Sequence, residues 1–127
     1  MVFYKTEAVT LKVSRFAEAD KIVTFFTREK GKISAIAKSA YKSTSKFGGR
    51  LELFSHNYVF LADGKNLDIV SQMETIDTFH SIRENEQTLK AGIYIVKVLY
   101  YFLESHSKNE RLFELLLDCL KMLKGGL

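Results

Sequence analysis

The spacing of apolar residues divides the chain into two parts. Through the first three-fifths, apolar and polar residues alternate, as at Val9, Leu11 and Val13, and a period of two is typical of strands with one buried face. Similar strand-like runs cover residues 22–27, 32–40, 51–61 and 67–76. Five strands joined mostly by short turns predict a small β-barrel rather than a sandwich.

The turns between these runs depend on glycine, because the chain contains no proline. Gly31 can adopt a positive φ after residues 28–30, and the pair Asp63-Gly64 is a strong hairpin signal. In the longest run, Phe54, Tyr58 and Phe60 share one face of the predicted strand.

From about Ser81 the apolar period becomes that of an α-helix, with one apolar stripe over residues 89–103 and another over residues 112–123. The helix ends are predicted from a capping box at Ser81 and Glu84, a second candidate N-cap at Asn85, a capping box at Ser107 and Glu110, and a stop at Gly125-Gly126. We therefore expect an α+β protein, with a barrel domain over residues 1–80 and the start of an α-helical domain over residues 81–127.

Both predicted helices are apolar on nearly every face, and a helix of that kind is normally buried. Two helices and a small barrel cannot cover all of this surface. We expect either that the chain is cut off inside a helical bundle, or that it self-associates through residues 89–123.

The net charge of +4 is distributed unevenly along the chain. Residues 1–50 hold eleven Lys/Arg and four Asp/Glu, a balance of +7, whereas residues 51–127 hold eight and eleven, a balance of −3. This division predicts a basic face on the N-terminal half, which suits an anionic partner such as a nucleic acid. The alternative is a solvated surface that only favours solubility.

The basic residues are concentrated in a segment that runs from Arg28 to Arg50. Within it, Lys38, Lys42, Lys46 and Arg50 recur every four residues, and Tyr41 and Phe47 lie between them. Proteins that bind single strands combine such a cationic track with aromatic stacking surfaces. The predicted DNA-binding residues are Arg15, Lys21, Lys38, Tyr41, Lys42, Lys46 and Arg50, with Arg15 and Lys21 flanking the first turn. Tyr41 is the better stacking candidate, whereas Phe47 is as well explained as a core residue.

No group of residues indicates catalysis or metal binding. Cys119 is the only cysteine, and His56, His80 and His106 share no metal-ligand spacing. Glu18 and Asp20 resemble a carboxylate pair, but they are better explained by capping a turn or by pairing with Arg15 and Lys21. We therefore predict that the protein is not an enzyme and uses no cofactor.

The N-terminus lacks the uninterrupted apolar core of a signal peptide, and the longest apolar run contains Lys97 and is too short to span a bilayer. We expect no membrane association, and the single cysteine suits a reducing cytoplasm.

Four segments together resemble a known family. They are RFAEADKIV (Arg15 to Val23), FFTREKGKISAIAKSAYKS, FGGRLELFS (Phe47 to Ser55) and GKNLDIVSQME (Gly64 to Glu74). In this order they are similar to the amino-terminal half of the RecO family of bacterial recombination mediators. The resemblance covers about residues 4–123.

The resemblance implies an OB-fold for residues 1–80, followed by an α-helical domain. It also implies binding of single- and double-stranded DNA, strand annealing, and cooperation with RecR and single-strand-binding protein to load the recombinase at the nucleoid. Many RecO proteins carry a four-cysteine zinc motif in their later part, and nothing in this sequence matches it. Two alternatives stay open: an adaptor whose basic loop docks an acidic peptide tail, and an RNA-binding OB module.

Overall fold

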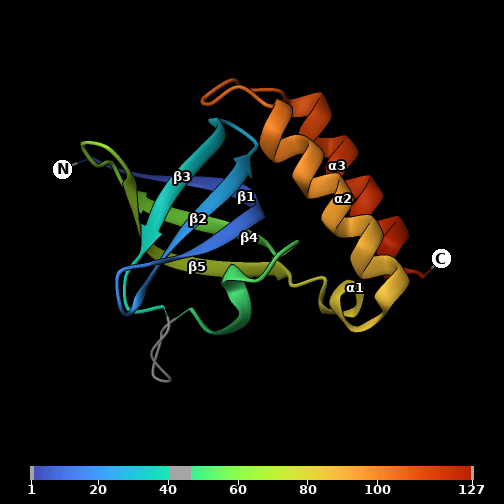
Figure 1. Cartoon of the computed structure of the whole chain (residues 1–127). Coiled ribbons are helices and arrows are strands. Elements are labelled where there is room, and N and C mark those ends of the chain that lie inside the picture. Colours follow the sequence, from blue (N-terminus) through green and yellow to red (C-terminus); the bar gives the residue numbers. More distant parts are fainter. Residues whose placement is uncertain (1, 41–46, 127) are drawn as a thin grey trace.

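The computed structural model describes residues 2–40 and 47–126. Its five strands are β1 (Phe3–Phe16), β2 (Asp20–Thr27), β3 (Gly31–Ala37), β4 (His56–Ala62) and β5 (Asp68–Asp77). They close a barrel in the order β1-β2-β3-β5-β4 (Figure 1). Neighbouring strands are antiparallel except β3 and β5, which pair in parallel through Ala35–Asp68 and Ile36–Ile69. This arrangement confirms the predicted five-stranded OB-fold barrel.

The barrel interior is filled by alternating side chains of its strands. Ile33, Ala35 and Ala37 of β3 all point inward, in agreement with the sequence pattern. Phe47 joins this core with 1% of its surface exposed, so of its two explanations the core role is correct. Leu51, from the short helix η1 (Gly48–Leu51), packs in the same cluster.

Among β2 to β5, two strand boundaries differ from the sequence prediction by three residues or more. β3 ends at Ala37 rather than residue 40, because Ser39 adopts a left-handed φ of 60° and donates its N–H to Asp20 Oδ1 at 2.8 Å. β4 begins only at His56, after η1 and after Phe54, whose φ is 75°. Phe54 therefore does not share a strand face with Tyr58.

Three helices follow the barrel: α1 (His80–Glu84), α2 (Glu86–Phe102) and α3 (Glu110–Lys124). Asn85 caps α2 by accepting hydrogen bonds from the N–H groups of Gln87 and Thr88, as the second candidate cap predicted. Asn109 caps α3 by accepting from Leu112 N–H. The predicted capping boxes at Ser81 and Ser107 are wrong. Ser81 lies inside α1, whose N-cap is Phe79, and α3 is capped by Asn109, which directly precedes the helix.

The helices cover the outer face of β1 and β2. A second hydrophobic cluster joins barrel residues to all three helices, and it includes Val9, Leu11, Phe26, Phe54, Phe79, Ile82, Val96, Phe113, Leu116, Leu117, Leu120 and Leu123. Leu11 follows Val9 on the face toward the helices, and the register shift between Thr10 and Lys12 then places Lys12 on the helix side and turns Val13 toward the barrel core. β1 is thus buried on both faces over part of its length.

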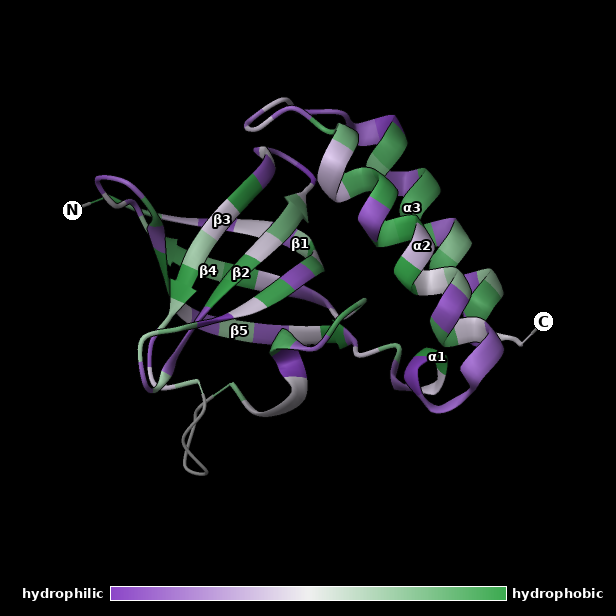
Figure 2. Cartoon of the chain, in the orientation of Figure 1, coloured by the Kyte–Doolittle hydropathy of each residue, from purple (hydrophilic) through white to green (hydrophobic). Residues whose placement is uncertain are grey.

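Apolar side chains also lie on the outside of the helix pair, and Figure 2 shows hydrophobic and hydrophilic residues interspersed along both ribbons. Tyr94, Phe102 and Met122 are 72%, 83% and 74% exposed. The sequence expectation of surplus apolar surface agrees with this arrangement. Truncation and self-association both stay predictions.

Arg28 links the barrel to α3 through polar contacts. Its guanidinium donates to both carboxylate oxygens of Glu7, at 2.9 and 3.1 Å, and lies 3.3 Å from Glu110 and 2.5 Å from Glu114. His56 Nε2 lies 2.6 Å from Glu7 Oε2. Burial lowers the pKa of His56 despite the opposing effect of Glu7. Burial alone would raise the pKa of Glu7, but the hydrogen bonds from Arg28 and His56 lower it.

The loop between α2 and α3 lies along β3. Ser105 forms a parallel bridge with Lys32, and His106 N–H donates to the Lys32 carbonyl at 3.0 Å. Gly31 is closely approached by this loop, since a Cβ atom there would lie 2.5 Å from the Ser107 carbonyl oxygen. The loop therefore fixes the start of α3 relative to the barrel.

Acidification is expected to destabilise the fold in two stages. The pKa of His56 is lowered on folding, so below about 6.5 the unfolded chain binds a proton that the folded chain does not, and the free energy of unfolding falls. The lowered pKa of Glu7 adds a further loss below about 4.5. Urea unfolding between pH 4 and 8 measures this profile. His56→Gln should flatten the upper stage, whereas His80→Gln, at an exposed position, should keep the parent's profile.

Three glycine variants are expected to form a graded series of stability. Gly31→Ala places a Cβ on a backbone with φ +70° and against the Ser107 carbonyl, so it should cost more than the ~1–2 kcal/mol of left-handed backbone strain alone. Gly48 has φ +53° and no neighbour within 4 Å among the described residues, so Gly48→Ala should cost only that strain. Gly49→Ala has neither feature and should be nearly neutral. Equal urea midpoints for the three variants would contradict the series.

Candidate nucleic-acid interface

Three of the predicted basic residues meet at one end of the barrel. Arg15 of β1 lies directly opposite Lys21 of β2, and Lys21 lies opposite Ala37 of β3, which Lys38 follows. Arg15 and Lys21 project from the ribbon face that also carries the buried Val23, so they lie at the mouth of the barrel. We call Arg15, Lys21 and Lys38 the basic end. It lies on the lower side of the barrel in Figure 1.

Two hydrogen bonds stabilise the chain turns at the basic end. Asp20 accepts the Ser39 N–H at 2.8 Å, and Arg15 Nη2 donates to the Glu18 carbonyl at 3.1 Å. Asp20 therefore stabilises a turn, which is one of the roles that the sequence indicated for this carboxylate pair.

Arg50 is held on the β4–β5 wall. Its Nε donates to Thr75 Oγ1 at 3.1 Å, and its carbonyl accepts from Asn57 Nδ2 at 2.9 Å. Arg50 thus contacts Thr75 and Asn57, a residue pair that joins β4 to β5. Tyr41, Lys42 and Lys46 lie outside the described residues, so their predicted binding roles stay predictions.

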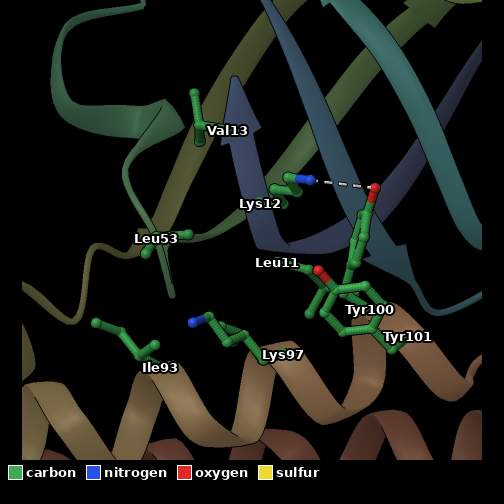
Figure 3. Close-up of a pocket in the computed structure, with 9 residues that line it drawn as sticks. Leu11, Lys12, Val13, Leu53, Ile93, Lys97, Tyr100 and Tyr101 are labelled. Carbon is green, nitrogen blue, oxygen red and sulfur yellow. Dashed lines mark hydrogen bonds between the residues drawn. The ribbon is translucent and has the colours of Figure 1, made fainter. Parts of the chain in front are cut away.

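A groove that the sequence did not indicate lies between β1 and α2 (Figure 3). It has a cavity volume of about 190 Å³. It is lined by Leu11, Lys12, Val13, Leu53, Ile93, Val96, Lys97, Tyr100 and Tyr101. Lys12 Nζ donates to the Tyr100 hydroxyl at 3.4 Å and lies 4.5 Å from the centre of its ring. Lys32 Nζ donates to the Tyr100 carbonyl at 2.6 Å.

The sequence analysis treated Lys97 only as an interruption of an apolar run. The spacing of Lys97 and Tyr101, four residues apart on a helix, places them on one helical face and is the signal that could have identified them. The proximity of Lys97 and Tyr101 to Lys12 could not be predicted from the sequence, because it depends on how α2 packs against β1.

Within residues 2–40 and 47–126, no group of three or more His, Cys, Asp or Glu side chains could hold a metal ion. Over the same residues, no helix combines the length and apolar character needed to cross a bilayer.

Comparison with known proteins identifies relatives of this chain. Residues 1–79 match the family described as "Recombination protein O N terminal". The chain is 36% identical over 126 residues to a "DNA repair protein RecO" of Pelotomaculum thermopropionicum, covering 99% of this chain and 49% of that protein. It is 37% identical over 123 residues to a protein of the same name from Dehalococcoides mccartyi, covering 97% and 49%.

A third relative, from Nocardioides, is also named "DNA repair protein RecO" and is 45% identical over 78 residues, which is 61% of this chain and 32% of that protein. The chain spans about half the length of the first two relatives. With a matching family model over the whole barrel and relatives along nearly its full length, the chain belongs to the RecO family.

Proposed function

We propose that this chain binds DNA in repair and recombination, holding the phosphate backbone at the basic end. The observation that carries the proposal is the placement of Arg15, Lys21 and Lys38 on neighbouring parts of β1, β2 and β3. Like charges directly opposite each other on adjacent strands repel, and a bound phosphate reduces that repulsion. The names of the relatives, which refer to DNA repair, support the same role.

The proposed activity is binding and strand annealing without catalysis. Cations that neutralise phosphates lower the repulsion between two strands, so complementary strands can approach each other on the protein. Lysine and arginine contacts to phosphate carry little base preference, which suits a protein that must act on any sequence. We therefore propose that neither a catalytic residue nor a cofactor takes part.

RecR and single-strand-binding protein are the partners that we propose for this role, and the site of action that we propose is the cytoplasmic nucleoid. Membership of the RecO family is what supports these proposals. An acidic peptide docked at the basic end is the competing function. It predicts a shallow dependence of affinity on salt, because a short peptide releases few counterions.

Replacing Arg15 and Lys38 with glutamine should weaken binding to all DNA sequences about equally. Each phosphate contact that is lost should lower the slope of log affinity against log salt by ~0.7 for single strands and ~0.9 for duplex. Fluorescence anisotropy with labelled oligonucleotides between 50 and about 300 mM salt measures the slope. Both side chains are exposed, so the fold should be retained.

The matched control is Lys65→Gln, an exposed lysine in the turn between β4 and β5. It removes the same charge away from the basic end and should leave the slope near that of the parent. If the double variant and the control bind DNA equally well, the basic end is only a solvated surface and the proposal is wrong.

A further inference from the structure

We propose that the groove between β1 and α2 holds an unstacked base of single-stranded DNA, with Tyr101 as the stacking surface and Lys97 and Lys12 as contacts to the flanking phosphates. This inference rests on the proposed DNA-binding function and adds a second site to it. The groove favours single-stranded over duplex DNA, because a base inside a duplex has both faces covered by its neighbours.

The floor of the groove suits the face of a base. Leu11, Leu53, Ile93 and Val96 supply apolar side chains to a cavity of about 190 Å³. A base that is no longer stacked on its neighbours is stabilised by contact of its apolar face with such a surface. A concave apolar floor with charges at its rim is the arrangement that single-strand binders combine.

Tyr101 is exposed yet held in place. Its side chain is 71% exposed, and its ring meets that of Tyr100 edge to face, with centroids 5.1 Å apart and planes at 88°. Tyr100 is itself fixed between the ammonium groups of Lys12 and Lys32, at 4.5 and 5.2 Å from its ring centre. An aromatic ring that is already oriented loses little entropy when a base stacks on it.

The charges at the rim favour an anion. None of the nine residues that line the groove is acidic, and two are lysines. Lys97 makes no hydrogen bond or ion pair with the part of the chain that the structure describes, and Figure 3 shows its side chain extending toward Leu53. A phosphate beside the stacked base would meet this free ammonium.

The groove is also close to the basic end along β1. Lys12 and Arg15 are three residues apart, which corresponds to about 10 Å along a strand. They lie on opposite faces of β1, and β1 pairs with β4 only up to Val9. The segment before β4 also bonds to Thr10, whose N–H donates to the Ser55 carbonyl and whose carbonyl accepts from Phe54, so a DNA strand that joins the two sites would have to pass around β1 beyond Thr10.

The test compares matched variants of α2 in anisotropy titrations with labelled oligothymidylate. Tyr101→Ala should weaken single-strand binding about 5- to 140-fold with little change in salt slope, because stacking is not electrostatic. Tyr101→Phe keeps the ring and should bind like the parent. Lys97→Met should lower the single-strand salt slope by ~0.7. The controls are Tyr94→Ala, at a tyrosine 72% exposed, and Lys90→Met, both on the same helix.

An abasic oligonucleotide of equal length separates stacking from charge. It retains the phosphates, so its affinity should be insensitive to Tyr101→Ala. The inference is overturned if Tyr101→Ala and Tyr94→Ala both bind oligothymidylate like the parent, or if Tyr101→Ala weakens duplex and abasic binding as much as single-strand binding. In both cases the proposed function stands, provided that the parent binds DNA. If the parent binds neither single strands nor duplex, the proposed function fails as well.

Discussion

Strand β1 is buried on both faces between Ala8 and Leu11, and the arrangement of the other elements depends on this double burial. Ala8 faces the barrel interior, while Val9 and Leu11 face the helices. Fully burying one Val, Leu or Phe side chain contributes about 1.5–3 kcal/mol, whereas a solvent-accessible ion pair contributes roughly 0–1 kcal/mol. The apolar contacts therefore determine that the helices dock, and the partly exposed contacts of Arg28 with Glu110 and Glu114 determine mainly how α3 is oriented.

The sequence was sufficient to predict the barrel, because alternation such as that along β3 reflects one filled interior. It was less informative at helix ends, where asparagines that directly precede α2 and α3 supply the caps and the nearby serines do not. Of the candidate site, Arg15, Lys21 and Lys38 could be predicted, since their clustering follows from adjacent strands and short turns. The groove could not be predicted. Lys12 and Tyr101 are far apart in the chain, and only the packing of α2 on β1 brings them together.

The number of Lys and Arg residues in the basic half of the chain is larger than the number that can contact a bound anion, because some of them are engaged within the protein. Arg28 is engaged by Glu7, Glu110 and Glu114, so it serves the junction between barrel and helix. Lys32 donates to the Tyr100 carbonyl and helps to position that ring. Among the described cations of this half, Arg15, Lys21 and Lys38 lie at the basic end and Lys12 lies beside the groove, whereas Lys5 and Lys30 are exposed next to Tyr58 and Tyr4. A long anionic polymer can contact the basic end and the groove at once, which a compact anion cannot.

The bridge between Ser105 and Lys32 has a consequence for solubility. β3 pairs with β5 only through Ala35 and Ile36. Without the loop between α2 and α3, the first residues of β3 would form an exposed strand edge on the side away from β2. Unpaired strand edges recruit other chains and promote aggregation. The loop between α2 and α3 occupies this edge at Lys32, where His106 donates to the carbonyl. Docking of the helices therefore protects the barrel against edge-to-edge association. A mutation that detaches the helices would expose the edge of β3 to pairing with a strand of another molecule.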